Sequence, residues 1–578
     1  MTYLELLQKA RTLNDIAHIL GLKPASVSYT LYKIPDNKKY NSFEIMKSNG
    51  GKRTIYAPTT RLKLLQRRLA DLLYICAHEQ VISNESQPKL NHGFSRGLSI
   101  VTNAKVHAKK RYIFNLDLQD FFPSCNFGRV YGFFVSDSRL NLNPKVARII
   151  AQIACYNGYL PQGSPCSPII SNYLGTILDV KMLGLAKKFK LTYSRYADDL
   201  TFSTNALEFP PDIAKQESGS DSAWIVGSLL LAQIQKAGFS VNHTKTHMQV
   251  RGSRQSVTGL TVNKKANIKS EYYRTVRAMC HNLFQNGEYY VQKSNKSKSD
   301  FDEDGEDQVK VTDKNILHGR LEHIYHVKSQ VDTRDWRWNY KNKGYAPPYA
   351  AYEMYKKFLF FKYFVALDRP LIVPEGKTDT VYLRSAISQR YTLYPNLGGL
   401  GDNGFSYKVG FMNYTTRIRD ILELGDGSDR LKNLILMYAE KLRHFGYCPL
   451  CFPVIILVDN DDGAKEIFSV AKKYVSDIGF ESTYQFYHLY ANLYLVKTPE
   501  GGEGSKSCIE DFLPSWVLSR KVDGKNFDRS KKHGDSTRIG KEVFARKVVA
   551  ANKESIDFSD YDGIMSRIEA VIKDYSEK

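Results

Sequence analysis

Three aspartates in the first 200 residues are of the right type and placement to hold metal ions for phosphoryl transfer. Asp117 follows a short apolar run that begins at Ile113, and the adjacent pair Asp198 and Asp199 follows a second run that ends at Tyr196. Two divalent ions about 4 Å apart lower the pKa of an attacking hydroxyl group and stabilise a leaving pyrophosphate. Carboxylates at neighbouring strand ends could bind both ions, so these aspartates are candidate catalytic residues and metal ligands.

A second set of acidic residues follows two apolar runs in the second half of the chain. Glu375 follows the run that begins at Leu371, and Asp459 and Asp461 follow the longer run that begins at Pro453. Continuous apolar runs are typical of parallel strands covered on both faces, whose functional groups gather at the carboxyl ends. These carboxylates are candidates to hold Mg²⁺ or Mn²⁺ for phosphodiester cleavage, with Glu375 as a metal ligand or general acid/base.

The segments around these residues predict at least two folded units. Between residue 50 and about residue 262, short apolar runs alternate with helical segments, which indicates an α+β unit. A strand-rich region of the α/β type begins at Leu371, and the composition changes near residue 368. A length of 578 residues is also too long for one ordinary domain.

The amino-acid composition indicates which kinds of partner and which cellular location to expect. The formal net charge of +22, from 82 basic and 60 acidic residues, favours a nucleic-acid partner. Eight scattered cysteines do not form a disulfide framework and favour a cytoplasmic protein. The most apolar stretch, from Phe358 to Leu367, is short and interrupted by Lys362, so no membrane partner is expected. The sequence leaves a homo-oligomer open.

Several segments resemble the motifs of reverse transcriptases. Tyr196-Ala197-Asp198-Asp199 resembles their YxDD signature, and Asp117, followed by bulky aromatic residues, resembles their first metal motif. Three further matches come in the family's order: Gly51 to Pro58, Leu160 to Pro165, and Gly238 to Ser240 followed by Asn242 and Lys245. Chance agreement in both type and order is remote.

This resemblance implies roles for four further residues and two Mg²⁺ ions at the three aspartates. Lys52 and Arg53 would bind the triphosphate of the incoming deoxynucleotide, and the Arg53 guanidinium suits phosphate oxygens. Gln162 would line the nucleotide and template pocket, and Phe122 would exclude a ribose 2′-hydroxyl. Taken singly, Phe122 would be read as a core aromatic residue and Gln162 as a turn residue.

Two elements are similar to those of the retron subfamily. Asn103-Ala104-Lys105-Val106-His107 resembles its NAxxH element, and Val257-Thr258-Gly259 resembles its VTG element. The resemblance implies a structured non-coding RNA that serves as template and primer and ends joined to its cDNA in a branched product. The residues predicted to bind this RNA are Asn103, His107, Lys109, Lys110, Val257, Thr258, Gly259, Tyr272, Arg274 and Arg277. For any single basic residue among them, a solvated helix face is an equally good interpretation.

The second acidic set resembles the Toprim fold, which is Rossmann-like. Glu375 and the pair Asp459-x-Asp461 match its acidic motifs, and Glu375-Gly376-x-x-Asp379 is nearer to its nuclease branch than to its topoisomerase branch. The resemblance implies a metal-dependent nuclease with a nucleic-acid substrate. A degenerate fold or a surface acidic turn is the alternative.

The predicted fold class is therefore multidomain α+β and α/β, a right-hand polymerase followed by a Toprim domain. The predicted organisation is an N-terminal helical segment (1–49), fingers and palm (50–264), a thumb with an acidic loop near 300–307 (265–330), a linker (331–367), a Toprim domain (368–515) and a basic helical C-terminal extension (516–578).

We predict a retron reverse transcriptase fused to a nuclease effector that acts in antiphage defence. Two alternatives remain. One is a mobile-element reverse transcriptase of the group II intron kind, which the NAxxH and VTG elements disfavour. The other is an RNA-binding scaffold without catalysis, which the complete carboxylate sets disfavour.

Overall fold

The computed structural model describes residues 1–46, 51–83, 89–217, 223–292, 308–331, 350–402, 404–425, 427–481, 484–500, 506–529 and 537–578. The chain divides into two compact units. The first unit contains Met1–Tyr273 and residues 326–331. The second unit contains Arg274–Val291, Gln308–Tyr325 and residues 350–578. The acidic loop predicted near 300–307 and residues 332–349 of the predicted linker lie outside the described residues.

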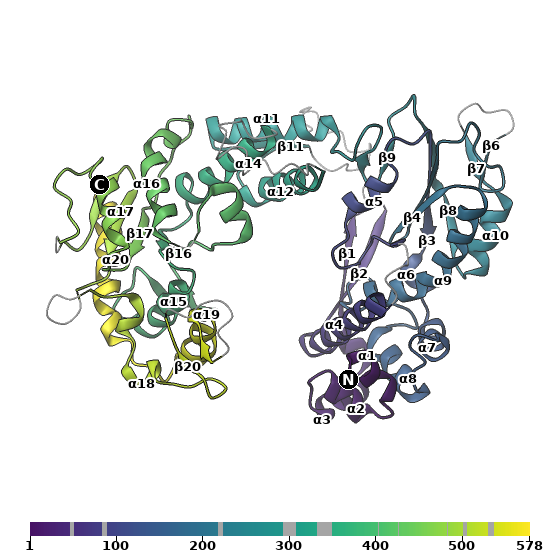
Figure 1. The fold of residues 1–578 in the computed structure, drawn as a ribbon, viewed down its shortest axis with the longest axis horizontal. Helices are drawn as coiled ribbons and strands as arrows, with labels where there is room; N and C mark the ends of the chain where they lie inside the picture. The colour runs from purple at the N-terminus through teal and green to yellow at the C-terminus, as the bar shows by residue number, and fades with distance from the viewer. Residues whose placement is uncertain are drawn as a thin grey trace. The chain divides into compact units, whose positions relative to one another are not determined.

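A four-stranded antiparallel sheet lies at the centre of the first unit (Figure 1). Its order is β4 (Thr192–Tyr196), β5 (Asp199–Thr204), β3 (Tyr112–Gln119) and β8 (Ser240–Val250). Along β3, Phe114, Leu116 and Leu118 share one face and are buried in the main hydrophobic core. Strand alternation therefore places Asp117 on the opposite face of the sheet, away from this core.

Helices and short hairpins complete the first unit. The helices are α1 (Tyr3–Lys9), α2 (Leu13–Ile19), α3 (Pro24–Ser28), α4 (Thr60–Ser83), α5 (Ile100–Val106), α6 (Phe121–Ser124), α7 (Phe127–Ser136), α8 (Pro144–Ala154), α9 (Ser167–Lys188) and α10 (Ser228–Lys236). The hairpins are β1 (Tyr40–Met46) with β2 (Lys52–Pro58), β6 (Ala214–Gln216) with β7 (Trp224–Val226), and β9 (Ser256–Val257) with β10 (Leu260–Thr261). The first hairpin corrects a predicted boundary, because β1 begins ten residues before position 50 inside the segment predicted as helical.

Helix α9 is long and apolar enough to span a bilayer, the one such helix in the described part of the chain. Within its most apolar window, 67% of the residues are buried inside the protein. This burial matches a core helix, since its apolar side chains belong to the same core as those of the central sheet.

A five-stranded sheet lies at the centre of the second unit. Its order is β16 (Gly410–Phe411), β13 (Leu371–Pro374), β17 (Val454–Val458), β19 (Leu493–Lys497) and β18 (Tyr487–Tyr490). All neighbouring pairs are parallel except β18 with β19. Both faces of β13 and β17 are buried, which confirms the α/β interpretation of these apolar runs.

The C-terminal segment from residue 516 belongs to the core of the second unit. The sheet residues Ile372 and Ile455 share a hydrophobic cluster with Val517, Phe544 and Ile564. The predicted C-terminal extension (516–578) therefore packs as part of this unit, because its helices bury apolar side chains against the α/β sheet. The remaining elements are α14 (Ala350–Phe360), α15 (Asp379–Arg390), β14 (Gly398–Gly401), β15 (Gly404–Tyr407), α16 (Ser428–Leu442), α17 (Ala464–Ala471), α18 (Ser515–Leu518), β20 (Asn526–Phe527), β21 (Arg538–Ile539), α19 (Lys541–Phe544) and α20 (Asp562–Ser576).

The predicted thumb, residues 265–330, differs in two respects. It contains helices α11 (Ser270–Asn286) and α12 (Lys314–Val331), but also the strand pair β11 (Tyr289–Gln292) and β12 (Gln308–Val311). Most residues of both helices also belong to the second unit. The domain boundary predicted near residue 368 therefore does not coincide with the boundary between the two units. Buried aromatic contacts explain the difference, since Phe284 of α11 packs on Phe361 and Phe445.

Candidate active site

The three predicted aspartates meet on the central sheet of the first unit. Asp117 on β3 is the register partner of Asp199 on β5, and the amide of Leu118 donates a hydrogen bond to the Asp198 carbonyl at 3.0 Å. The register between β3 and β8 shifts between Asn115 and Asp117. The irregularity therefore lies directly beside Asp117, near the end of β3.

Two residues of β8 bind the Asp117 carboxylate. The Lys245 ammonium lies 2.9 Å from Oδ2, and the Asn242 amide donates to Oδ1 at 3.2 Å. The hydrogen bond to Asp117 raises the pKa of Lys245, and the charges of Asp198 and Asp199 also contribute. Lys245 therefore carries a positive charge within the field of all three aspartates.

The remaining two carboxyl groups have raised pKa values. Loss of solvation raises the pKa of Asp198, and the charge of Asp117 adds to this. Loss of solvation, followed by the charges of Asp198 and Asp117, raises the pKa of Asp199 to about 7. Asp199 nevertheless keeps more than a third of its surface in solvent, so water screens part of its interaction with the other carboxylates.

The donor set fits a hard divalent cation such as Mg²⁺. Carboxylate oxygens are the ligands that Mg²⁺ prefers, and a cation would relieve the repulsion among the three groups. In the part of the chain that the structure describes, no three acidic, histidine or cysteine side chains are already arranged around one ion position. Metal binding by Asp117, Asp198 and Asp199 therefore remains a prediction that requires their side chains to turn toward the ion.

A buried ion pair that the sequence did not suggest holds the turn of the aspartate pair. The guanidinium of Arg195 is fully buried and contacts the Asp179 carboxylate through two hydrogen bonds of 2.8 and 2.7 Å. Its third nitrogen donates to the carbonyl of Ala197 at 3.0 Å, and Ala197 has a left-handed φ of 56°. Arg195 thus couples helix α9, which carries Asp179, to the strained residue just before the predicted catalytic pair, Asp198 and Asp199.

Gly93 packs directly against the same turn. A Cβ atom at this position would lie 2.3 Å from the amide nitrogen of Ala197, so no side chain fits there without moving the turn. We expect Gly93→Ala to slow primer extension by about 100-fold, the effect of misplacing a catalytic group by about 1 Å. Gly132→Ala in α7 is the matched control, because its Cβ would meet no atom within 4 Å. Equal rates for the two variants would contradict the prediction.

The four predicted nucleotide-binding residues lie in different surroundings. Arg53 lies close enough to Asp198 to lower that residue's pKa, whereas Lys52 pairs with Glu44 across the β1–β2 hairpin at 2.8 Å. The Gln162 carbonyl accepts a hydrogen bond from Tyr56 of β2 at 2.8 Å. Phe122 is half-buried, and its ring centroid lies 6.2 Å from that of Phe94. Arg53 thus lies beside the aspartates. Gln162 contacts the β1–β2 hairpin, which carries Arg53.

Asn103 and His107 are fully buried, which corrects the prediction that their side chains bind RNA. His107 lies 2.7 Å from both the Ser203 and the Ser194 hydroxyl oxygens, and Ser194 donates to Asn103 at 2.6 Å. Burial lowers the pKa of His107 to about 3, so the ring is neutral and bonds both serines. The NAxxH residues therefore fasten α5 to β4 and β5, the two strands that flank the aspartate turn.

The VTG element packs on the same helix. Val257 is buried, Thr258 donates a hydrogen bond to the Ile100 carbonyl of α5 at 3.2 Å, and Gly259 is exposed with a φ of 81°. Lys109 is also exposed, and the Lys110 ammonium contacts the Thr192 hydroxyl at 3.1 Å. Gly259 and Lys109 are therefore accessible to RNA, whereas the Val257 side chain is not.

The other predicted RNA-binding residues lie on α11. Arg274 and Arg277 are exposed, and Tyr272 is half-buried. Their predicted contact with RNA stays a prediction.

The acidic residues of the second unit also lie close together. Glu375 follows β13 and Asp459 follows β17, and these strands are parallel neighbours. The Asp459 amide donates to Glu375 Oε2 at 3.4 Å, and a Cβ at Gly463 would lie 3.1 Å from Asp461 Oδ1 and 3.7 Å from Glu375 Oε1. The structure therefore brings Glu375, Asp459 and Asp461 together at the carboxyl ends of the strands.

Two further carboxylates and one lysine lie at this acidic cluster. Asp379 is buried and accepts the Gly376 amide at 2.7 Å, and Glu510 is fully buried with the Lys541 ammonium 2.9 Å away. Asp379 is the last residue of the motif Glu375-Gly376-x-x-Asp379. Nothing in the sequence indicated that Lys541 would lie at this site, since it belongs to the segment predicted as a basic helical C-terminal extension.

Several carboxylates of this second site lie close together and are at least partly buried, and both conditions raise their pKa values. Burial, followed by the charges of Asp379, Glu375 and Glu510, raises the pKa of Asp459 to about 8. Burial and the charge of Glu510 raise the pKa of Asp379 to about 7, and burial raises that of Glu375. Burial opposes the charged form of Lys541, but the neighbouring acids outweigh it and raise its pKa. The donor set fits Mg²⁺ or Mn²⁺ by the same argument as in the first unit.

Comparison with known proteins agrees with the geometry of the first unit. Residues 45–269 match the family described as reverse transcriptase (RNA-dependent DNA polymerase). The first unit is thus a reverse transcriptase domain with the right-hand polymerase fold.

Curated relatives narrow the family. The chain is 35% identical over 288 residues to the retron Mx65 reverse transcriptase of Myxococcus xanthus, covering 47% of this chain and 62% of the relative. It is 32% identical over 249 residues to the retron Ec86 reverse transcriptase of Escherichia coli, covering 43% of this chain and 70% of the relative. It is also 32% identical to the retron Mx162 reverse transcriptase of Myxococcus xanthus, of which it spans 58%. The chain belongs to the retron reverse transcriptase family.

Proposed function

We propose that the first unit is an RNA-directed DNA polymerase that uses a structured non-coding RNA as template and primer. The observation that carries this proposal is the meeting of Asp117, Asp198 and Asp199 on one sheet edge, with Lys245 bound to the first of them. The retron family supports the choice of RNA and of a branched RNA–DNA product. Deoxynucleoside triphosphates are the second substrate.

The residues of the chain divide the work of this proposed reaction. Bound Mg²⁺ would supply an activated primer hydroxyl and stabilise the pyrophosphate. Arg53 would bind phosphate oxygens next to Asp198, where it already acts on the carboxyl charge. Phe122 would close the space beneath the sugar, and Lys245 would release Asp117 when the ion arrives. Gln162 would contact the nucleotide or the template base.

Nucleic acid that copurifies with the protein from cells tests the proposed template and product. Sequencing after separate digestion with ribonuclease and deoxyribonuclease should find one RNA species joined to DNA complementary to part of it. Unbranched DNA, or a random mixture of cellular RNA, would exclude the retron reaction and favour the mobile-element or scaffold alternative.

For the second unit we propose a Toprim nuclease that acts on nucleic acid in antiphage defence. The acidic cluster at the carboxyl ends of parallel strands supports this proposal, as do the two acidic motifs in the sequence. Glu375, Asp459 and Asp461 would hold Mg²⁺ or Mn²⁺. Lys541 would pair with Glu510 and place a positive charge beside the scissile phosphate.

Glu375→Gln should lower metal-dependent cleavage of a nucleic-acid substrate by at least about 100-fold, because the variant loses a ligand or proton-transfer group. Primer extension by the same preparation should not change. Glu542→Gln is the matched control, since Glu542 is an exposed residue that pairs with Lys377. Protection from phage should be lost with Glu375→Gln and kept with Glu542→Gln. Cleavage that persists in Glu375→Gln would refute the nuclease proposal and leave the polymerase proposal intact.

We also propose a cytoplasmic location. The eight cysteines are scattered along the chain, a usage typical of proteins in a reducing compartment.

A further inference from the structure

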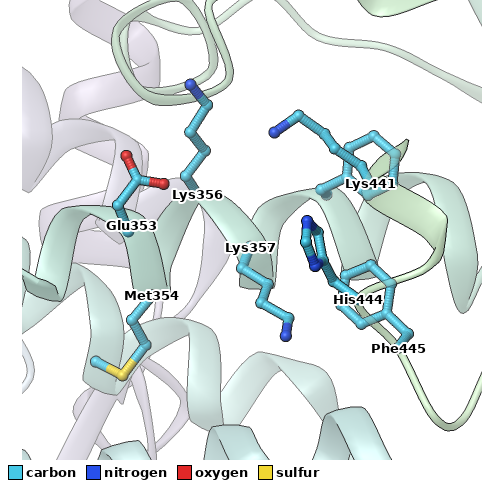
Figure 2. Close-up of a pocket in the computed structure, with 8 residues that line it drawn as sticks. Glu353, Met354, Lys356, Lys357, Lys441, His444 and Phe445 are labelled. Carbon is cyan, nitrogen blue, oxygen red and sulfur yellow. The ribbon is translucent and has the colours of Figure 1, made fainter. Parts of the chain in front are cut away.

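A basic pocket lies in the second unit, formed by residues outside both acidic clusters. It has a volume of about 300 Å³ and is lined mainly by helix α14 and by the end of α16 with the residues that follow it. Lys356 and Lys357 come from α14, and Lys441 and His444 come from the other side. Figure 2 shows Lys441 and His444 facing α14 across the pocket.

The wall of the pocket is apolar. Phe360 and Phe445 are buried, and their rings lie nearly parallel with centroids 6.2 Å apart. The Lys357 ammonium lies 5.2 Å from the centre of the Phe445 ring, and the Lys441 ammonium lies 5.9 Å from that of Phe360. An apolar wall reduces solvent screening, so an anion in the pocket would feel these charges more strongly than at an open surface.

Among the residues that the structure describes, two of the three ammonium groups have no carboxylate partner. Lys356 pairs with Glu423 at 3.4 Å, but in the described ranges no acidic oxygen lies within ion-pair distance of Lys357 or Lys441. Glu353 is the acidic residue of the lining, and it is exposed.

The pKa values of Lys357 and Lys441 are both lowered. Burial lowers the pKa of Lys357, and burial together with the charge of Lys356 lowers that of Lys441, although Glu353, Glu440 and Glu423 oppose the shift. A bound anion would stabilise the charged form of both.

We propose that this pocket binds a phosphate group. A lining with three lysines and a histidine suits a multiply charged anion with several oxygen acceptors, rather than a single carboxylate. The phosphate could come from a free nucleotide or pyrophosphate, or from the end of a nucleic-acid strand. A site of this kind would let the second unit sense or hold a phosphorylated ligand away from its acidic cluster.

Labelling of lysines in the wild-type full-length protein tests the site without any mutation. The protein is treated with an amine-reactive reagent in EDTA, and the label at each lysine is measured by mass spectrometry. The probes are inorganic pyrophosphate, a nucleoside triphosphate, and single-stranded oligonucleotides with a 5′-phosphate or a 5′-hydroxyl. We expect at least one phosphate probe to slow labelling of Lys357 and Lys441 by about tenfold at saturation. The exposed Lys472 and Lys473 serve as references.

The pattern of protection identifies the source of the phosphate. Protection by pyrophosphate or the nucleotide supports a small ligand, and protection by the 5′-phosphorylated strand alone supports a strand end. No protection by any probe, or equal protection at Lys472 and Lys473, would overturn the proposal. As a second measurement, the probe that protects should raise the Tm of the wild type and of Lys472→Ala/Lys473→Ala, but not that of Lys357→Ala/Lys441→Ala. An equal rise in all three proteins would also overturn it.

Discussion

Replacing Asp199 by Asn lowers the rate of primer extension by at least about a thousandfold, equivalent to about 4 kcal/mol in the activation free energy. The substitution keeps the size of the side chain but removes one of the three negative charges that meet on the sheet edge. A neutral amide holds a divalent ion much more weakly than a carboxylate does. The rate should be measured at saturating Mg²⁺ with an annealed RNA template, so that weak substrate binding does not limit it.

The same substitution should make the metal-free protein more stable. The pKa of Asp199 is raised to about 7 in the folded protein, against 3.8 for an ordinary aspartate. Between about pH 4 and pH 7 the folded state therefore binds more protons than the unfolded state, and its stability falls as the pH rises. Asp199→Asn removes this loss, so in EDTA its Tm should exceed that of the wild type at pH 8 and approach it at pH 4.

Asp212→Asn is the control for this experiment, because Asp212 is exposed in the same unit. It should leave both the rate and the Tm unchanged. Two results would contradict the assignment of Asp199: a rate within about tenfold of the wild type, or a variant that is less stable than the wild type at pH 8.

Replacing Arg195 by Met destabilises the first unit by about 3–5 kcal/mol, because it leaves the Asp179 carboxylate buried without a partner. Arg195 and Asp179 are exposed by 0% and 7% of their side-chain surface, so water cannot replace the lost hydrogen bonds. DNA synthesis should fall as well, since the Ala197 carbonyl loses the donor that holds the turn before Asp198. Denaturant unfolding and primer extension measure the two effects.

A combined variant separates these two roles of Arg195. Arg195→Met with Asp179→Leu and Tyr193→Phe replaces the buried polar network by apolar side chains, and the third change removes a hydroxyl that donates to Asp179. Apolar replacement of a buried ion pair is often neutral for stability, so most of the lost stability should return. DNA synthesis should not return, because no donor to Ala197 is restored. Recovery of synthesis together with stability would show that the pair serves folding alone.

The amino-acid sequence by itself determined the local features of both sites. The apolar runs that form β3, β13 and β17 depend on neighbouring residues, and each of these strands contains or is followed by a predicted carboxylate. The order of the polymerase motifs was also readable from the sequence, and residues 45–269 match the reverse transcriptase family.

The tertiary structure alone decided which residues are buried and which distant segments meet. Asn103 and His107 look like surface RNA contacts in a basic segment, yet they are enclosed by Ser194 and Ser203 nearly 100 residues later. Lys541 reaches Glu510 only because the C-terminal helices bury apolar side chains on the α/β sheet. Burial and ion pairing depend on packing between segments far apart in the chain, and periodicity within a short window carries no information about that packing.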